Sequence, residues 1–281
     1  ADSGLSSAPL AMGQTGPVVE ARGLAVRDAI DEVLQRYTQD GYIQVHDFGD
    51  EVVYAPVNEA RIQMDFYKNN IVHLLTREAI MAAAYARAAR DGAPDVDRLR
   101  SAAHFLSVTF KYEFIYEPTA RFDDTFAATL VDFLEAGIFE EREIEGEGEP
   151  QTVLEVPARG PAEDTLEMLH FVLEPWLEAY WLLALGLQEF LTPDVPEITE
   201  KEFLRQLQDM AATRFHVGDI QCIEAGSATT FKHALGAYAS LGYLVRAKRG
   251  RDSILSLPDR ANLERDPIAD LANGLRWYLH R

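Results

Sequence analysis

The sequence of 281 residues is poor in cysteine, in basic residues and in long apolar runs. Its single cysteine, Cys222, cannot form a disulfide within the chain, which fits a reducing compartment. Lysine and arginine number 26 against 46 aspartates and glutamates, and the net charge of −20 argues against binding nucleic acid or anionic lipid by charge alone. The most apolar stretch, residues 175–191, is interrupted by Glu178 and Glu189. It therefore predicts a core helix and not a membrane-spanning one.

The first residues of the chain lack the marks of a secretion signal. Residues 1–17 are small, polar and rich in glycine and proline, without the basic start and apolar core of a signal peptide. We expect them to form a linker or a disordered start. Because the sequence begins abruptly and without a methionine, we also expect further sequence upstream of Ala1.

A helix, a glycine and a hairpin recur three times along the chain. The glycines are Gly41, Gly137 and Gly242, and the positions eleven, seven and four residues before each are apolar or aromatic. This spacing places the three side chains on one face of a helix. A glycine is favoured where a helix ends in the left-handed conformation, which a Cβ disfavours. The stripe residues are Ile30, Leu34 and Tyr37, then Phe126, Leu130 and Phe133, then Phe231, Leu235 and Tyr238.

A two-stranded hairpin is predicted after each glycine. The second strands, residues 52–54, 153–156 and 254–257, are each closed by a proline, which ends strand pairing. Residues 140–149 hold six glutamates and one arginine, so they predict a solvated turn in the middle hairpin. The predicted fold class is mainly α (α+β), a helical region with three small β-hairpins in helix–Gly–hairpin units.

These units divide the chain into four segments. We expect each hairpin to end a segment or to be followed only by the closing helix. The segments are a linker at 1–17, a first helix–hairpin unit at 18–60, long helices with the second unit at 61–157, and helices with the third unit and a C-terminal helix at 158–281.

Long helices are predicted between the units. Residues 76–90 and 94–116 form two, because Pro94 suits the first turn of a helix. Residues 161–191 form the longest, bent at Pro175, which lacks a backbone donor.

Two helix starts carry capping residues. Thr199 with Glu202 predicts a capping box for a helix that ends near Phe215. Ser227 is expected to cap the helix of the third unit, and residues 260–280 close the chain as a helix.

Each unit resembles the last helix and the wing of a winged-helix module. DNA binding would require a basic surface, yet the helices are poor in lysine and arginine and the middle wing is acidic. Only the third wing is basic, with Arg246, Lys248, Arg249 and Arg251. The units are therefore interpreted as architectural, and no nucleic-acid partner is expected. A stand-alone interaction or regulatory module is the alternative function.

Residues 62–90 form the stretch that is richest in polar groups. A long buried helix is expected to carry Tyr67, Asn70, His73 and Arg77. Asn70 and His73 are one turn apart, as are His73 and Arg77, so they can share a face. Since a buried polar face needs partners, we expect a hydrogen-bond network that fixes packing, with a substrate contact as the alternative. These four residues are candidates for a domain interface or for support behind an active site.

No catalytic motif or cluster of metal ligands is recognised in the sequence. Residues 46–50 (HDFGD) fall in the turn of the first hairpin. The sequence has no Gly-rich phosphate loop, its seven histidines are scattered, and Gly226–Ser227 lacks the nucleophile-elbow pattern. We therefore predict no catalytic residue, no metal and no cofactor in this chain.

Residues 65–84, DFYKNNIVHLLTREAIMAAA, resemble a segment of glycerol-3-phosphate 1-O-acyltransferases in which a Phe-Tyr-x-Asn-x-x-x-His pattern opens a long helix. The resemblance extends from about residue 24 to about residue 258, and residues 110–118 are closer to the bacterial members. Dihydroxyacetone-phosphate acyltransferases share the architecture. The other blocks that resemble the family, in the same order, are residues 110–139, 173–185, 224–235 and 239–251.

The resemblance implies transfer of an acyl group from acyl-CoA or acyl carrier protein to the sn-1 hydroxyl of glycerol 3-phosphate, giving lysophosphatidate for phospholipid biosynthesis. The family's chemistry is assigned to an H-x-x-x-x-D motif, which this sequence lacks, since His46 reaches Glu51 at that spacing. We expect the chain to be the C-terminal region of such an enzyme. It would support or regulate an upstream acyltransferase domain and be inactive alone. The enzyme is expected on the cytoplasmic side, peripheral to the plasma membrane, with any membrane contact made outside this chain.

Overall fold

The structure is a computed structural model, mainly helical with three small antiparallel sheets. The chain divides into two compact units, Ala1–Ile71 and Val72–Arg281, which are described separately. The expected linker at 1–17 lies outside the described residues, and the four predicted segments stay a prediction. The described residues are 30–49, 51–57, 60, 72–114, 120–145, 150–158, 160–259 and 265–279.

In the first unit a helix precedes a hairpin. Residues 30–39 are helical, and β1 (Ile43–Asp47) pairs antiparallel with β2 (Val52–Pro56). The predicted apolar stripe is only partly buried here, since the side chain of Ile30 is 52% exposed. The described part of this unit holds no second helix on which the stripe could pack.

The longest helix described in the second unit is α6 (Ala162–Phe190), and the other elements are given in their order before and after it. Before α6 come α3 (Thr76–Ala88), the 3-10 turn η1 (Ala89–Asp91), α4 (Val96–Thr109), α5 (Phe122–Glu135), β3 (Glu140–Ile144) and β4 (Gln151–Glu155). After α6 come β5 (Glu197–Thr199), α7 (Glu200–His216), the 3-10 turn η2 (Ile223–Gly226), α8 (Ala228–Ser240), β6 (Val245–Arg249), β7 (Asp252–Ser256) and α9 (Pro267–Arg276).

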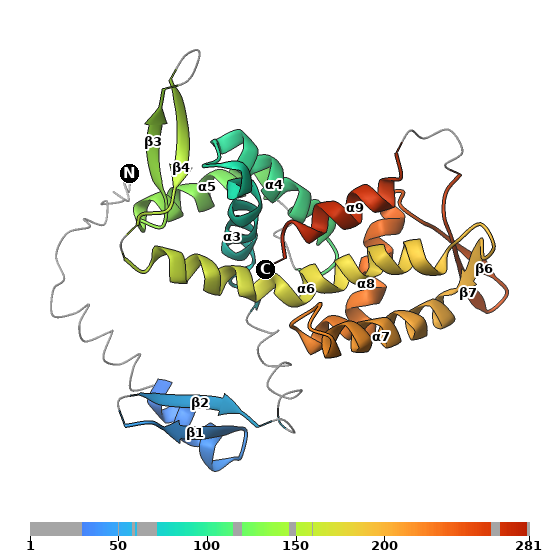
Figure 1. Cartoon of the computed structure of the whole chain (residues 1–281), viewed down its shortest axis with the longest axis horizontal. Helices are drawn as coiled ribbons and strands as arrows, with labels where there is room; N and C mark the ends of the chain where they lie inside the picture. The colour runs from blue at the N-terminus through green and yellow to red at the C-terminus, as the bar shows by residue number, and fades with distance from the viewer. Residues whose placement is uncertain are drawn as a thin grey trace, which may run out of the picture. The chain divides into compact units, whose positions relative to one another are not determined.

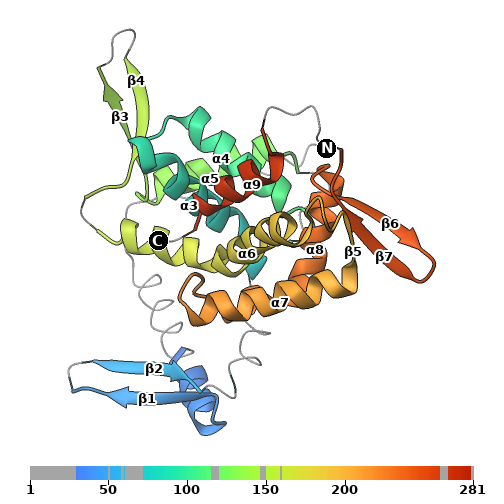
Figure 2. The same ribbon diagram turned by 45° about the vertical axis from the view of Figure 1, so that its right-hand side comes forward.

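The long helix α6 is the centre of the second unit. Its residues Leu173, Leu177 and Leu183 are fully buried, and it packs against α3, α7, α8 and α9. Pro175 lies inside the helix, as predicted. In both views α6 runs across the unit, and the hairpins β3–β4 and β6–β7 project near its opposite ends (Figures 1 and 2). The apolar face of one helix therefore organises most of this core.

The three predicted glycine caps are confirmed. Gly41, Gly137 and Gly242 have φ angles of 76°, 67° and 81°. In each case the next N–H donates to a carbonyl five residues back, which is the main bond of the Schellman closure of a helix. The repeat therefore has one backbone geometry at three places. The bonds, each 2.9 Å long, run from Tyr42 to Tyr37, from Ile138 to Phe133 and from Tyr243 to Tyr238.

The sequence-based description differs from the structure at two places. The helix α3 begins at Thr76, as the predicted helix at 76–90 does, but a turn at residues 73–75 separates it from the helical Val72, and residues 61–71 of the longer predicted stretch lie outside the described residues. The helix expected over 94–116 ends at Thr109, and a turn carries the chain to Phe114. Neither the turn at residues 73–75 nor the end at Thr109 is marked by a glycine or a proline, so local signals could not locate them.

The third hairpin also differs from the prediction, because it belongs to a three-stranded sheet. Strand β5 pairs antiparallel with β7, so the strand order is β5-β7-β6. Glu197 on β5 holds Arg249 on β6 through two hydrogen bonds of 2.8 and 3.1 Å. Glu200 holds Arg246 through two bonds of 2.8 Å. Two of the four cations of the basic wing are thus paired with acids.

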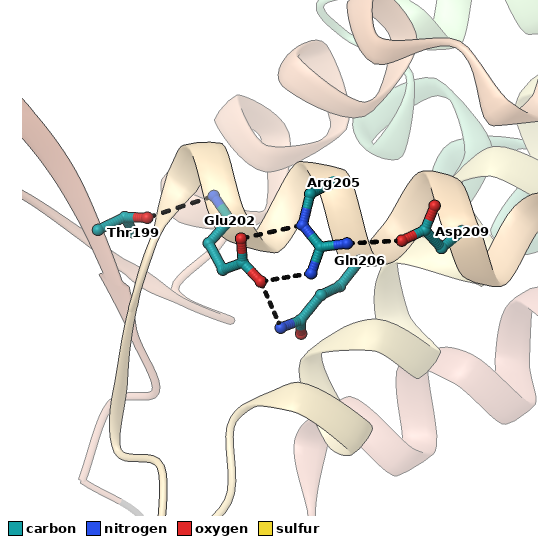
Figure 3. Close-up of polar contacts among 5 residues, drawn as sticks. All are labelled: Thr199, Glu202, Arg205, Gln206 and Asp209. Carbon is teal, nitrogen blue, oxygen red and sulfur yellow. Dashed lines mark hydrogen bonds and ion pairs between the residues drawn. The ribbon is translucent and has the colours of Figure 1, made fainter.

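The N-terminal capping residues of α7 and α8 are those that the sequence predicts. The Thr199 hydroxyl accepts a hydrogen bond of 3.2 Å from the Glu202 N–H, and Ser227 accepts one of 3.5 Å from Thr230. The Glu202 carboxylate does not complete a capping box. Figure 3 shows it facing Arg205, which also reaches the next turn of α7. The hydrogen bond with Arg205 lowers the pKa of Glu202 to about 2.

Two helical glycines give a matched pair of substitutions. A Cβ at Gly186 in α6 would lie 2.8 Å from Leu207 Cδ1 and 3.3 and 3.4 Å from the rings of Phe190 and Phe203. Overpacking costs about 1–3 kcal/mol, and alanine returns about 1 kcal/mol of helix propensity, so we expect Gly186→Ala to destabilise by about 1 kcal/mol. Gly274→Ala in α9 meets no atom within 4 Å among the described residues and should stabilise by about 0.5–1 kcal/mol. Urea denaturation measures both, and equal stabilisation by the two changes would contradict the packing at Gly186.

Candidate functional site

A cavity of about 840 Å³ lies between α3, α4 and α5. The three helices lie side by side in both views (Figures 1 and 2). Buried apolar side chains from all three helices form its wall, and exposed polar side chains also line it. The exposed polar lining residues are His73, Arg77, Lys111 and Asp124.

Two of the four candidate residues, His73 and Arg77, line this cavity. The His73 ring makes an edge contact with Phe114 at 6.0 Å between centroids. The Arg77 guanidinium donates to Glu78 at 2.7 Å and lies 3.5 Å from the Asp132 carboxylate on α5. Both cavity residues are exposed, and the Arg77 side chain is 51% exposed.

The structure therefore brings His73 and Arg77 to one site but does not bury them. The expectation of a buried network is wrong for these two side chains, because the partners of Arg77 are acids near the surface. Tyr67 and Asn70 lie outside the described residues. The assignment of all four residues to a domain interface, or to support behind an active site, stays a prediction.

A second polar site, which the sequence did not reveal, is centred on Glu113. One carboxylate oxygen accepts a hydrogen bond of 3.0 Å from the Tyr180 hydroxyl of α6. The other lies 3.1 Å from Nδ1 of His233 on α8. The Glu113 side chain is 4% exposed and that of His233 is 45% exposed. Burial raises the pKa of Glu113, and the hydrogen bonds with His233 and Tyr180 oppose that rise.

Aromatic rings pack against Tyr180, whose hydroxyl donates to Glu113. Phe110 and Tyr180 meet edge to face at 4.9 Å, and Tyr180 and Tyr238 meet in the same way at 5.7 Å. The Tyr238 hydroxyl donates to the Tyr180 carbonyl at 2.7 Å, and burial raises the pKa of Tyr238. A carboxylate on Nδ1 can orient an imidazole for proton transfer. Neither Glu113 nor His233 lines the cavity, however, so their geometry supports the joining of the turn after α4 to α6 and α8.

A second buried carboxylate in the described chain, that of Glu178 on α6, anchors the connection between α7 and α8. It accepts hydrogen bonds from the backbone N–H groups of Gln221 at 2.5 Å and Cys222 at 2.9 Å. Glu178 is 2% exposed, and burial raises its pKa while the two backbone donors oppose that rise. The sequence signal for Glu178 was an acid within an apolar block, which was interpreted only as an interruption of a core helix, and Glu113 was not singled out.

No metal centre or membrane span is found among the described residues. No three His, Cys, Asp or Glu side chains in that part of the chain are grouped as metal ligands. None of the helices described is long and apolar enough to cross a bilayer. The polar sites of the described chain are therefore the cavity lining and the buried carboxylates.

A family model described as the glycerol-3-phosphate acyltransferase C-terminal region matches residues 9–247. The chain belongs to this family. The predicted resemblance is confirmed, and the matched span contains the cavity and both carboxylate sites of this acyltransferase C-terminal region. The contact between Glu113 and His233 joins two parts of the matched span that are 120 positions apart in sequence.

Curated relatives of this acyltransferase C-terminal region are named as acyltransferases. The dihydroxyacetone phosphate acyltransferase of Oryctolagus cuniculus is 27% identical over 195 residues, which is 69% of this chain and 26% of the relative. The plsB1 proteins of Mycobacterium tuberculosis and Mycobacterium bovis, whose names describe them as acyltransferases, are each 24% identical over 221 residues. That match covers 78% of this chain and 34% of each plsB1 protein. The chain thus spans about a quarter to a third of the length of these relatives.

Proposed function

We propose that this chain is the C-terminal region of an enzyme that transfers an acyl group from acyl-CoA or acyl carrier protein to the sn-1 hydroxyl of glycerol 3-phosphate. The product is lysophosphatidate, and the setting is phospholipid biosynthesis at the cytoplasmic side of the plasma membrane. The family match over residues 9–247 carries this proposal. The names of the relatives support an acyltransferase reaction. The chain matches only a small share of their length, which supports an accessory role for this chain within a longer enzyme.

In this proposal the chain supplies no catalytic residue. It lacks the H-x-x-x-x-D motif to which the family's chemistry is assigned. Its buried carboxylates, Glu113 and Glu178, accept hydrogen bonds from groups that join its own helices. Its role is then to pack on the acyltransferase domain of the same protein and to hold or regulate the substrate cleft. Acyl donor and glycerol 3-phosphate are bound through that domain.

The helix–Gly–hairpin units serve this role as winged-helix-like spacers. The helix of the third unit buries Phe231, Leu235 and Tyr238, so its apolar face is used inside the protein. Arg246 and Arg249 on the adjacent wing are held by Glu200 and Glu197. Both observations favour an architectural unit over a nucleic-acid reader, which needs free cations for phosphate.

An activity assay with acyl-CoA and glycerol 3-phosphate tests the division of labour. The 281-residue chain alone is expected to show no turnover above background, whereas the full-length protein that contains it should be active. Robust turnover by the chain alone would contradict the proposal that the chemistry lies elsewhere. An inactive full-length protein would favour the alternative of an interaction or regulatory module.

Substitution of His73 and Arg77 in the full-length enzyme tests their predicted support of the acyltransferase domain. We expect His73→Ala and Arg77→Ala each to lower kcat/KM by about tenfold, or about 1.4 kcal/mol of transition-state stabilisation. Both side chains are exposed in this unit, so Tm should fall by no more than about 2 °C. Arg98→Ala is the matched control, since Arg98 pairs with Asp91 away from the cavity. A loss of Tm with unchanged kcat/KM would assign the pair to packing.

A further inference from the structure

We infer that the cavity between α3, α4 and α5 binds one long-chain fatty acid, with the hydrocarbon chain against the apolar wall and the carboxylate at Lys111. A monoacyl ligand with a single negative charge is the class that the lining fits. The inference stands on the cavity alone and does not rest on the proposed acyltransferase role.

The size and the wall of the cavity favour a flexible apolar ligand. Its volume of about 840 Å³ lies within the range of about 300–1,000 Å³ that is usual for small-molecule sites. The wall is formed by Ile80 and Met81 of α3, Ala103 of α4 and Phe126 of α5, all nearly inaccessible to solvent. Methionine adapts its shape readily, which suits a chain with many rotamers.

Three of the four hydroxyl groups in the lining, those of the threonines, already donate to backbone carbonyls one turn back, and the fourth belongs to Ser107. Thr76 donates to the Val72 carbonyl at 3.0 Å, and Thr129 donates to the Thr125 carbonyl at 2.9 Å. Thr125 itself donates to the Arg121 carbonyl at 3.2 Å. A polar ligand would therefore give up hydrogen bonds to water without gaining these three donors. A hydrocarbon chain has no hydrogen bonds to water to give up.

The charges at the exposed lining favour a monoanionic head over a phosphate. Arg77 is already held by Glu78 and Asp132. Lys111 has no ion pair among the residues that the structure describes, and its Nζ lies 5.0 Å from the centre of the Tyr112 ring. A carboxylate would balance this one ammonium group. A phosphate dianion would bring more negative charge to a lining that also holds Asp124.

Calorimetric titration of the 281-residue chain with saturated fatty acids, each below its critical micelle concentration, tests the inference. We expect one saturable site per chain. Affinity should rise about fourfold per added methylene, the factor that corresponds to burial of a CH₂ group, until the cavity is filled. The absence of saturable binding, or affinity that does not depend on chain length, would overturn the inference.

Matched variants locate the site. Ala128→Trp places an indole in the cavity and should weaken binding at least tenfold, whereas Ala127→Trp, on an exposed neighbour outside the lining, should leave it unchanged. Lys111→Gln should weaken binding of the free acid about tenfold but leave that of its methyl ester unchanged. Lys232→Gln on α8 is its control. Circular dichroism confirms that each variant is folded, and equal effects of a variant and its control would refute the site.

Two further ligands and the full-length protein complete the test. Lysophosphatidate of the same chain length should bind more weakly than the fatty acid, and tighter binding would overturn the carboxylate assignment. Monoacylglycerol should bind no better than the methyl ester. The full-length protein should bind the fatty acid as the chain does. If only the chain binds, the cavity is a surface covered by the rest of the protein, and the inference is wrong.

Discussion

Replacing Glu178 with alanine is expected to lower the free energy of unfolding by about 3 kcal/mol. The carboxylate accepts the backbone N–H groups of Gln221 and Cys222 at 2.5 and 2.9 Å and is buried in α6. Alanine would remove both acceptors and leave a cavity beside the connection between α7 and α8. Loss of that anchor should loosen η2 and the start of α8 together.

Two controls separate the hydrogen bonds from the helix. Glu189→Ala removes an exposed glutamate from the same helix and should change stability by less than about 0.5 kcal/mol. Glu178→Gln keeps the shape and one acceptor oxygen but turns an amide donor toward an N–H group. We expect it to cost about 1–2 kcal/mol, between the other two.

Urea denaturation and amide hydrogen exchange measure the effect of the Glu178 change. Exchange should quicken at the N–H groups of Gln221 and Cys222 in Glu178→Ala. If Glu178→Ala and Glu189→Ala had equal free energies of unfolding, the carboxylate would not be an anchor. Equal stability of Glu178→Ala and Glu178→Gln would mean that the volume of the side chain matters and its acceptors do not.

Features that depend on neighbours in sequence could be predicted from the sequence. The glycine caps at Gly41, Gly137 and Gly242 need only a helix stripe and a residue that accepts positive φ. The caps at Thr199 and Ser227 need a hydroxyl before the first turn. Each rests on a few adjacent residues, so its signal survives without knowledge of the tertiary fold.

Features that depend on distant contacts could not be predicted. Strand β5 is three residues long and is a strand only because it pairs with β7. Glu113 meets His233 across 120 positions, and Glu178 meets Gln221 across 43. In sequence Glu178 was only an interruption in an apolar block, and Glu113 stood among alternating aromatic and charged residues. The fold shows that such an acid can be the group that joins two segments.

The candidate site also has one part that could be predicted from the sequence and another that could not. His73 and Arg77 were chosen because one helical turn separates them, and both line the cavity. The turn at residues 73–75 and the acidic partners of Arg77 were invisible to helix periodicity. The cavity itself needs α5 to lie beside α3, a contact that no pattern in residues 62–90 specifies.

Replacing Glu113 with alanine is expected to cost about 2 kcal/mol at neutral pH, because Tyr180 loses the acceptor of its hydroxyl and His233 loses its carboxylate partner. Glu113→Gln keeps an acceptor for Tyr180 and removes a buried charge. We therefore expect it to cost less than about 1 kcal/mol at the same pH. The pair of variants distinguishes the hydrogen bond from the charge.

The pH dependence gives the sharper test of Glu113. Burial raises its pKa above the ordinary value of 4.5, so the native state binds this proton more tightly than the unfolded state. The resulting stabilisation is fully present below pH 4.5 and is lost as the pH rises through the raised pKa. Wild type should thus gain up to about 1.4 kcal/mol relative to Glu113→Gln for each pH unit lowered within that window.

The comparison removes the contributions of the other buried acids, because Glu174 and Glu178 are common to both proteins. The pKa of Glu178 is also raised by burial, but its contribution cancels in the difference between wild type and Glu113→Gln. Urea denaturation at several pH values between about 4 and 8 yields that difference. Parallel stability profiles would show that Glu113 ionises as freely as an exposed carboxyl. In that case the hydrogen bonds from Tyr180 and His233 offset the effect of burial on the pKa of Glu113, and the group that joins α6 to α8 is a charged carboxylate rather than a desolvated acid.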